Sequence, residues 1–249
     1  MNNKVQYLIE KELINIGLRP GDNVLVHSDS TAVRELTGLK WSDSLDLLKN
    51  CFLNILGKDG TLIVPTFNWD FCKGKSYVHE KTRSQVGMFT NNILFDDQSL
   101  RSFHPIYSFA AIGPQKKEIL NNISKSSFGN NSVFHKLHEL NAKIILFNFD
   151  LGTTFVHYVE QKLGVEYRYI KYFTGKVLIE VLVTKTVLSV GYNQDVFKFV
   201  AQGTELIEVE NGSVKNESIN IALQTAIETA VLQTINEGVA KNYWEIRHD

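Results

Sequence analysis

Residues 143–164 read KIILFNFDLGTTFVHYVEQKLG, and this stretch is the most informative about the fold. The apolar run over 144–149 predicts a strand buried on both faces of a sheet. The run ends at the turn DLG, and a helix follows that Thr153 or Thr154 can cap and that Gly164 ends. A strand, a turn and a helix in this order are typical of an α/β fold, in which ligands bind beyond the carboxyl ends of the strands.

Three polar residues share one face of this predicted helix. Thr154, His157 and Glu160 are spaced i, i+3 and i+6, so neighbours in the row lie one turn apart. The first turn of a helix favours a neutral imidazole, which accepts a proton, while the carboxylate can hold one ring nitrogen and pulls the pKa the opposite way. The row predicts a site for proton abstraction. An ordinary surface pair of His157 and Glu160 is the alternative, and these residues alone do not decide between the two.

Composition restricts the class of protein. The chain has 249 residues, 43% of them hydrophobic and 21% charged, which describes a globular protein of one large or two small domains. The net charge of −1 and the lack of a basic run argue against a nucleic-acid partner. Cys51, in an apolar helical stretch, is expected to be a core thiol, so we predict no disulfide and no zinc cluster. No apolar signal core or 18-residue apolar run is present, which predicts a cytoplasmic protein without membrane insertion.

The N-terminal half has the pattern of a parallel sheet. A short strand over 23–26, a helix over 42–56 that Ser42 can cap, and a strand over 61–67 form a βαβ unit. A polar, aromatic loop over 68–81 follows and is expected to be binding surface.

The C-terminal third has a different pattern. Segments 176–190 and 197–209 favour β residues with alternation, and 218–236 has helical spacing. The sequence therefore predicts an α/β fold with a mixed, largely parallel central sheet flanked by helices and an antiparallel β-rich C-terminal portion. We expect a single domain over 1–249, made of an α/β core (1–165) and a β-rich segment with a C-terminal helix (166–249).

Four polar segments lie next to predicted strands, at 27–31, 101–108, 126–132 and 150–157. The third resembles a phosphate-binding loop, because Gly129 permits close approach of the backbone and its Ser and Asn side chains can bind an anion. It lacks the spacing of a Walker loop. The alternative is a capping loop with Asn131 or Ser132 at the start of the next helix.

Five motifs occur in a familiar order: HSDS from His27, GTLIVPTF from Gly60, RSFHPIYSFAAIG from Arg101, FGNNS from Phe128 and TFVHYVE from Thr154. Together they resemble the aminoglycoside 3-N-acetyltransferase family. The resemblance is strong over residues 21–160 and continues faintly to the last predicted helix. The elements R-S-x-H-P-x-x-S and T-x-x-H-x-x-E are the specific ones.

The resemblance implies an acetyl-CoA-dependent N-acetyltransferase on an α/β fold distinct from the common small acetyltransferase fold. In the family, the His of T-x-x-H-x-x-E is the general base, which here is His157, with Glu160 as its orienting partner and Thr154 near the thioester. The amine would attack directly, because no covalent intermediate is needed. Neither a metal nor any cofactor besides acetyl-CoA, the acyl donor, is implied.

The resemblance also implies binding residues. The residues that would contact CoA or the acyl group are His27, Ser28, Asp29, Ser30, Thr31, Ser108, Gly129, Asn131 and Ser132. The expected substrate-binding residues are Asp70, Glu80, Arg101 and His104, of which His104, with Ser108, would shape the acyl end of the site.

Two departures from the family bear on the acceptor. Asp29 stands where the family usually has a second Ser, and Asp70 and Glu80 are the only acids of the 68–81 loop, with Asp96 and Asp97 nearby. Aminoglycoside sites need many carboxylates for polycationic drugs. An amino sugar, free or nucleotide-linked, is therefore expected as acceptor besides an aminoglycoside, which leaves glycan biosynthesis and antibiotic resistance both open. The β-rich segment could supply a strand edge for a homodimer.

Two other classes of function stay open. A metal-dependent hydrolase could use His27, His104, His157 and Glu160 as ligands, although the HExxH spacing is missing. A non-catalytic homologue that binds CoA or a sugar is the third hypothesis, and the intact T-x-x-H-x-x-E element argues against it.

Overall fold

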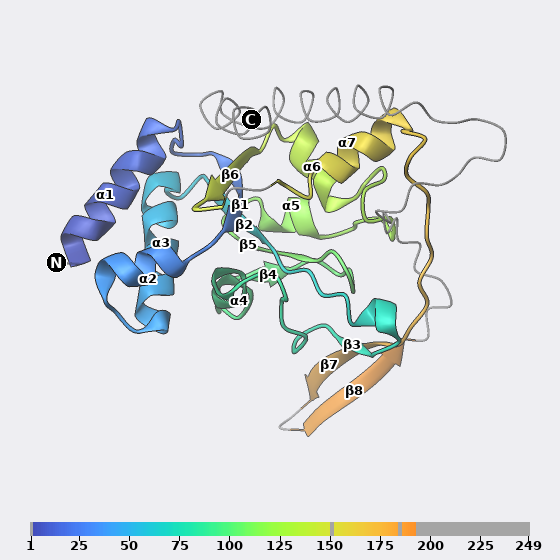
Figure 1. Cartoon of the computed structure of the whole chain (residues 1–249). Helices are drawn as coiled ribbons and strands as arrows, with labels where there is room; N and C mark the ends of the chain where they lie inside the picture. Colours follow the sequence, from blue (N-terminus) through green and yellow to red (C-terminus); the bar gives the residue numbers. More distant parts are fainter. Residues whose placement is uncertain (1, 150–151, 184–185, 193–249) are drawn as a thin grey trace.

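A five-stranded sheet forms the centre of the protein (Figure 1). The computed structural model describes residues 2–149, 152–183 and 186–192. The strand order is β4-β5-β2-β1-β6. The strands of this sheet are β1 (Asn23–Ser28), β2 (Thr61–Pro65), β4 (Leu100–Arg101), β5 (Phe109–Ile112) and β6 (Lys143–Phe147). The helices are α1 (Asn2–Asn15), α2 (Thr31–Thr37), α3 (Trp41–Leu56), α4 (Met88–Leu94), α5 (Lys116–Leu120), α6 (Val133–Glu139) and α7 (Val156–Leu163), with a 3-10 turn at Phe71–Lys73.

The sheet is mixed but largely parallel, which confirms the predicted fold class. Strand β1 pairs in parallel with β2 and with β6, while β5 pairs antiparallel with β2 and with β4. Four of the five strands therefore run in one direction. The βαβ unit predicted from residues 23–67 is the parallel pair β1 and β2 with α3 between them.

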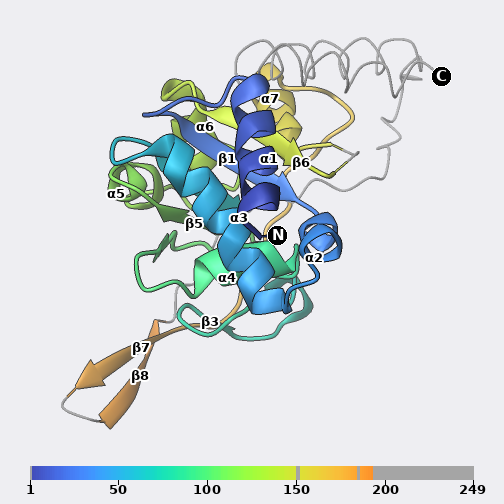
Figure 2. The same cartoon turned by 90° about the vertical axis from the view of Figure 1, so that its left-hand side faces the viewer.

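Helices cover both faces of the sheet, because alternate strand residues point to opposite sides. Val24 and Val26 of β1 pack in a cluster with α1, α3 and α4, whereas Leu25 between them packs in a second cluster with α5, α6 and α7. Ile145 and Ile144 of β6 divide between the two clusters in the same way. The two clusters are the cores of a three-layer α/β sandwich (Figures 1 and 2).

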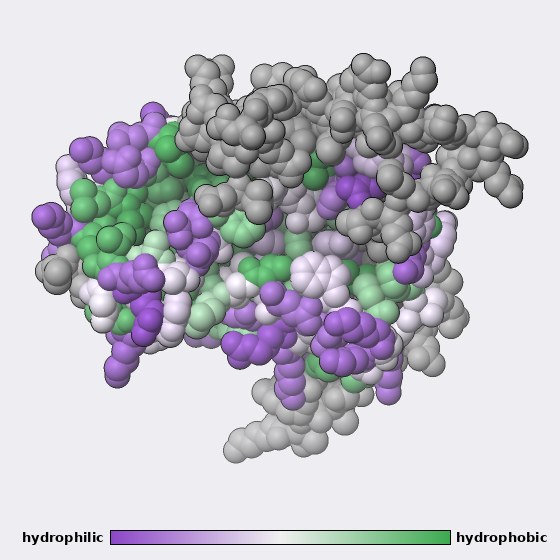
Figure 3. Space-filling model, in the orientation of Figure 1, coloured by the Kyte–Doolittle hydropathy of each residue, from purple (hydrophilic) through white to green (hydrophobic). Residues whose placement is uncertain are grey.

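Helix α1 leaves part of its apolar surface in solvent. It buries Ile9 and Leu13, while Tyr7, Leu8 and Ile14 are exposed. Figure 3 shows hydrophobic surface gathered over this side of the protein, around α1 to α3. Nothing in the described residues covers this surface.

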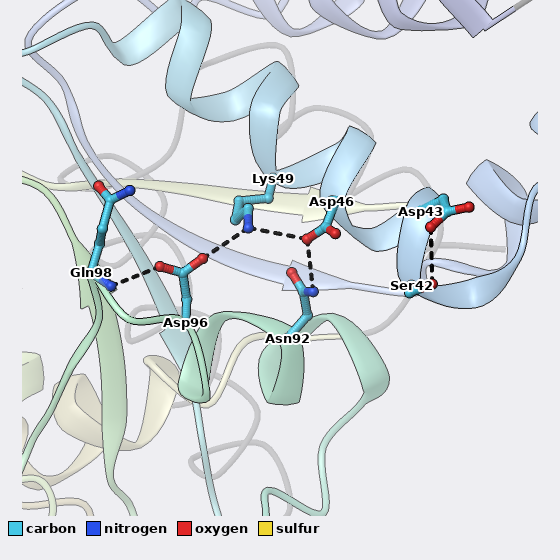
Figure 4. Close-up of polar contacts among 7 residues, drawn as sticks. All are labelled: Ser42, Asp43, Asp46, Lys49, Asn92, Asp96 and Gln98. Carbon is cyan, nitrogen blue, oxygen red and sulfur yellow. Dashed lines mark hydrogen bonds and ion pairs between the residues drawn. The ribbon is translucent and has the colours of Figure 1, made fainter.

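A polar cluster joins α3 to α4 on the same face of the sheet (Figure 4). Lys49 donates to Asp46 at 3.0 Å and to Asp96 at 2.8 Å, and Asn92 of α4 donates to Asp46 at 3.1 Å. Burial lowers the pKa of Lys49, but the hydrogen bonds to the two carboxylates outweigh it and raise the pKa. The lysine stays charged and fixes the turn after α4 against α3.

The carboxyl ends of the parallel strands meet at one edge of the sheet. The chain goes from β1 to β2 and onward to β5 on one side, and returns to β6 on the other side of β1. The order of strands thus reverses between β1 and β6, the place where open α/β sheets bind ligands. Polar segments of the sequence meet at or near this edge: residues 27–31, 66–68 and 101–108, together with the described residues 148–149 and 152–157.

A smaller sheet projects from the body of the protein (Figures 1 and 2). It consists of β3 (Tyr77–Val78), β7 (Val177–Val183) and β8 (Thr186–Tyr192), with β7 antiparallel to β8 and parallel to β3. The segment predicted to be strand over 176–190 therefore forms most of two paired antiparallel strands. The strand predicted over 197–209 and the helix predicted over 218–236 lie outside the described residues.

Several local predictions were wrong. Ser42 does not cap α3, because the helix already starts at Trp41, and the Ser42 hydroxyl donates to Asp43 instead. The strand predicted over 23–26 extends to Ser28, so the polar segment 27–31 begins inside β1, and its last residue starts helix α2, which the sequence did not suggest. Only the first part of the run 144–149 is buried on both faces.

Among the described helices, none is both long and apolar enough to cross a membrane.

Candidate functional site

His157 and Glu160 form a direct contact on α7. Nδ1 of His157 donates to Oε2 of Glu160 at 2.8 Å. The carboxylate is completely buried, while the imidazole side chain is 27% exposed. The i, i+3 spacing produces the predicted pair, but the acid is an interior residue, so the ordinary surface pair is the wrong description. Because Nδ1 carries the proton, Nε2 is the ring nitrogen with the lone pair.

Two residues beyond α7 complete the environment of Glu160. The hydroxyl of Tyr167 donates to Oε1 at 3.1 Å, and Arg168 donates from Nε to Oε2 and from Nη2 to Oε1, each at 3.1 Å. With His157, these donors supply four hydrogen bonds, about as many as a carboxylate accepts. Burial raises the pKa of Glu160, but the bonds from His157 and Arg168 outweigh it and hold the pKa below its ordinary value. Glu160 is therefore ionised in spite of its burial.

The end of α7 brings these donors back to the helix. Gly164 has a φ of 66°, the left-handed conformation that favours glycine, and caps the helix through hydrogen bonds to the Gln161 and Glu160 carbonyls. The chain then reverses, and Val165 donates its amide to the carbonyl of Glu160 at 3.2 Å. The predicted helix stop is confirmed.

The N-terminal end of α7 differs from the prediction. The helix begins at Val156, so Thr154 precedes it and is not on the helical face of His157. No side chain caps α7; Thr153 instead accepts the amide of Phe155 at 3.2 Å. The backbone carbonyl of Thr154 accepts the amide of His157 at 3.1 Å, which keeps the threonine one turn away from the ring.

The segment 126–132 packs beside His157. The ring of Phe128 lies edge-on to the imidazole, with 5.4 Å between ring centroids. Gly129 donates its amide to the Ser126 hydroxyl, and a Cβ at this position would lie 2.6 Å from that hydroxyl, so a larger residue would require the Ser126 side chain to move. Ser132 is buried and accepts the amide of His135, which is the capping arrangement considered above for this loop. Asn131 has a positive φ of 61° and is exposed.

His104 is buried next to the same segment. Its Nδ1 accepts the amides of Ile106 at 3.2 Å and Tyr107 at 2.9 Å, so Nε2 carries the proton, and Nε2 lies 3.4 Å from the hydroxyl of Ser127. Burial lowers the pKa of His104 to about 3. The ring holds the turn before β5 in shape and joins it to the segment beside His157.

The first polar segment meets α7 at the reversal of strand order. Nε2 of His27, near the end of β1, lies 3.0 Å from the hydroxyl of Thr153, and both side chains are buried. Burial lowers the pKa of His27 to about 4, so the ring is neutral. Asp29 accepts the amide of Thr31 at the start of α2, and hydrogen bonding from the side chain and the backbone of Thr31 lowers the pKa of Asp29. Ser28 has a buried hydroxyl without a hydrogen-bond partner in the described residues.

Arg101 and Ser108 belong to a buried network under the 68–81 loop. Arg101 donates to the Ser108 hydroxyl at 3.1 Å and to the carbonyls of His79 and Thr82 at 2.8 and 2.6 Å. Ser108 in turn donates to the carbonyl of Thr66 at 2.9 Å. These contacts attach the loop to the ends of β2 and β5.

The two acids of the 68–81 loop lie at its surface. Asp70 contacts Lys75 at 3.0 Å and Lys73 at 3.9 Å, and Glu80 is exposed. The bond from Lys75 is the main cause that lowers the pKa of Asp70. Its charge is already paired within the protein.

The sequence did not indicate Tyr167, Arg168, Thr153 and Ser127 as site residues. Tyr167 and Arg168 follow the capping Gly164 by three and four residues, and a chain reversal at that glycine was the signal that could have found them. Thr153 and Ser127 lie within segments that the sequence did indicate, but their contacts, with His27 and His104 respectively, join segments that are far apart in the sequence.

The ligand set of a metal-dependent hydrolase is not assembled in the part of the chain that the structure describes. No three His, Cys, Asp or Glu side chains there gather closely enough to hold a metal ion. His27 and His104 instead make the separate contacts given above, and both carboxylate oxygens of Glu160 already accept hydrogen bonds from His157, Tyr167 and Arg168.

The buried histidines predict how stability depends on pH. The folded protein holds His27 and His104 neutral, with pKa values lowered to about 4 and about 3, whereas the unfolded chain binds protons near pH 6.5. The contribution of these two neutral rings to the free energy of unfolding is therefore fully present above pH 6.5 and is lost as the pH falls toward 4. Between pH 6.5 and 5 each histidine is expected to lower the free energy of unfolding by about 2 kcal/mol.

Urea unfolding at pH 7, 6 and 5 measures this loss. His104→Asn, whose amide oxygen can accept the same two backbone amides, should flatten the dependence by about half of the two-histidine effect. Equal unfolding free energies at pH 7 and pH 5 would contradict the prediction.

Together, the sheet and the site describe an α/β protein that presents a carboxylate-held histidine beside the carboxyl edge of its sheet. The model of the family described as aminoglycoside 3-N-acetyltransferase matches residues 25–233. The chain belongs to this family, and the predicted family is thereby confirmed.

Two kinds of curated relatives match parts of the chain. The curli production assembly/transport component CsgG of Escherichia coli strain K12 is 32% identical over 100 residues, which is 40% of this chain and 35% of that protein. Aminoglycoside N(3)-acetyltransferase IV of Salmonella sp. is 28% identical over 159 residues, which is 63% of this chain and 58% of that protein. The chain thus spans about a third of the curli relatives and less than two thirds of the acetyltransferase.

Solved structures share the fold. The YokD protein from Bacillus subtilis has a TM-score of 0.58 at 22% identity, covering 75% of this chain and 79% of that chain. A structure titled AAC-IIIb binary with CoASH has a TM-score of 0.62 at 16% identity, covering 91% and 84%. The aminoglycoside acetyltransferase AAC(3)-IVa apoenzyme has a TM-score of 0.55 at 22% identity, covering 76% and 70%.

Proposed function

We propose that this protein is an N-acetyltransferase that moves an acetyl group from acetyl-CoA to a primary amine of an amino sugar or an aminoglycoside. The observation that carries the proposal is the pair of His157 and the buried, ionised Glu160, 2.8 Å apart on α7. Membership of the aminoglycoside 3-N-acetyltransferase family supports the reaction. The CsgG match spans about a third of that protein, so a part in curli assembly is not carried over.

The proposed reaction is a direct attack of the amine nitrogen on the thioester carbon. An amine attacks only in its neutral form, so the protein must remove a proton. Nε2 of His157 takes this proton as the new C–N bond forms, the C–S bond then breaks, and the proton passes to the leaving sulfur to give the free thiol. Glu160 stabilises the imidazolium in between, because the charge-assisted bond to Nδ1 strengthens when the ring is positive.

The donor is proposed to lie along the carboxyl edge of the sheet. A related structure contains CoASH, which supports this choice of donor. The expected contacts are the residues named from the sequence: His27, Ser28, Asp29, Ser30, Thr31, Ser108, Gly129, Asn131 and Ser132. Of these, Ser28 offers a buried hydroxyl without a partner in the described residues, which suits a ligand hydrogen bond.

The acceptor is proposed to carry few positive charges. Solved relatives are complexes with apramycin and with a gentamicin, which supports an aminoglycoside as one candidate. In this chain, however, Asp70 is paired with Lys75 and Lys73, so it has little charge to offer a polycation. A monoamine sugar, free or nucleotide-linked, fits this surface better. Arg101 and His104 are buried and support the walls of the site.

The remaining predictions concern the whole chain. A single acetyltransferase-like domain over 1–249, a cytoplasmic location and a homodimer joined through the β-rich segment stay predictions.

A thiol-release assay tests the function. Purified protein is mixed with acetyl-CoA and, in parallel, with aminoglycosides, amino sugars and nucleotide-linked amino sugars. Release with monoamine sugars above that with aminoglycosides is the expected result. Release with aminoglycosides alone would overturn the acceptor class, and silence with every amine together with no CoA binding by calorimetry would overturn the transferase.

A further inference from the structure

The guanidinium of Arg168 contacts both oxygens of Glu160. Nε reaches Oε2 and Nη2 reaches Oε1, each at 3.1 Å, and the Arg168 side chain is 17% exposed. A planar guanidinium bound at two points fixes the plane of a carboxylate as well as its position. That plane sets the direction in which Oε2 meets Nδ1 of His157. Arg168 thus acts on the imidazole through the carboxylate.

We propose that Arg168 is a positioning residue of the acetyl-transfer site, which keeps Glu160 ionised and oriented so that His157 presents Nε2 to the amine. The inference rests on the proposed function and deepens it. It concerns a residue outside the motifs that carry the family resemblance, since Arg168 lies beyond the T-x-x-H-x-x-E element.

The charge of Arg168 has a second consequence. A buried carboxylate without a compensating cation would favour the imidazolium, because an opposite charge within hydrogen-bond distance stabilises the charged form of a histidine. An imidazolium has no lone pair and is not a base. Arg168 balances the charge of Glu160 and so offsets this preference for the imidazolium. Glu160 and Arg168 together can therefore orient the imidazole of His157 without placing an uncompensated negative charge beside it.

Among the residues that the structure describes, the charged and titratable groups around this carboxylate come from three places. They are His157 on the same helix and Tyr167 and Arg168 in the segment after it, with Tyr107, before β5, within electrostatic reach of Arg168. Burial, and then the charge of Glu160, raise the pKa of Tyr167, so its hydroxyl stays a neutral donor. Burial also raises the pKa of Tyr107, against a smaller lowering by Arg168. Arg168 is therefore the cation that balances Glu160 among the groups named.

The pH dependence of kcat/KM separates positioning from a merely structural role. Arg168→Gln keeps a hydrogen-bond donor but removes the charge, and the acidic limb of the profile should move up by about one pH unit, which is about a tenfold loss below the limb. Arg168→Lys keeps the charge and should hold the limb near its wild-type position. Tyr167→Phe removes one neutral bond to the same carboxylate and should move the limb less than Arg168→Gln does.

An NMR titration of the full chain with labelled histidine gives a readout that does not depend on acetyl transfer. The His157 ring should take up its proton about one pH unit higher in Arg168→Gln than in the wild type. If no amine is acetylated, the proposed function fails, yet this titration still decides the role of Arg168. Unchanged protonation of His157 in Arg168→Gln would overturn the inference.

Folding of each variant is checked by thermal melting. If Arg168→Gln does not fold, Arg168→Lys decides, because it keeps the charge and loses the two-point contact. Arg168→Lys should then lower kcat about tenfold, while the acidic limb of the pH profile stays at its wild-type position. A wild-type kcat in Arg168→Lys would overturn the positioning role.

Discussion

Replacing His157 by alanine is expected to reduce acetyl transfer by about 10²- to 10⁴-fold, which is the usual contribution of a general base. The loss should fall on kcat, because the imidazole acts in the transition state, and CoA binding should remain close to wild type. Glu160, with its donors Tyr167 and Arg168, would lose one of its four hydrogen bonds but would stay paired. Steady-state kinetics with the best acceptor, with calorimetry for CoA, measures both quantities.

The same helix offers a control. Lys162 is exposed on α7 and rests over the ring of Tyr158, so Lys162→Ala should leave kcat within about twofold. His157→Gln keeps a similar volume without a base and should resemble His157→Ala. Wild-type kcat in both His157 variants would refute the general-base assignment.

Replacing Gly113 by alanine is expected to destabilise the fold by about 3 to 5 kcal/mol, the sum of backbone strain and a packing clash. Gly113 follows β5 with a φ of 139°, a conformation that L-residues rarely adopt. A Cβ there would lie 2.5 Å from the carbonyl oxygen of Gly60 and 2.6 Å from Cα of Thr61. These are backbone atoms next to the β2–β5 pairing, so neither neighbour can move aside without disturbing the sheet.

Gly38 separates the two causes of this loss. It also has a positive φ, 66°, but a Cβ there would meet nothing within 4 Å. Gly38→Ala should therefore cost only about 1 kcal/mol, the backbone term alone. Denaturant unfolding of both variants gives the difference. Equal losses would show that the contact with Gly60 and Thr61 does not limit the packing at Gly113.

The sequence was informative where a local pattern has one structural solution. Gly164 ends α7 as predicted, and Ser132, one of the two residues considered as the alternative cap, caps α6, because both features depend on residues within one helical turn. The pair of His157 and Glu160 also follows from spacing alone, since side chains three residues apart meet on a helix. The resemblance of the motifs was sufficient for the family.

Predictions failed where a short element depends on its neighbours. Helix α2, over Thr31–Thr37, has too few residues for a clear period and is held by packing of Val33 in the core. The threonine at 154 has a capping residue type, yet the structure starts α7 two residues later and uses Thr153 against His27. The second outcome depends on a contact with β1, which lies more than a hundred residues away from α7 in the sequence.

Local patterns in the chain were enough to predict the α/β class and the His157–Glu160 pair, because periodicity, turn residues and i, i+3 spacing act within a few residues. The family followed from the resemblance of the five motifs. Tertiary packing was needed to show that Glu160 is an interior carboxylate and that Arg168 and Tyr167 hold it. The same is true of His27 and His104, which are buried and neutral. Burial and charge compensation depend on which distant segments pack together, and no local pattern in the chain encodes that packing.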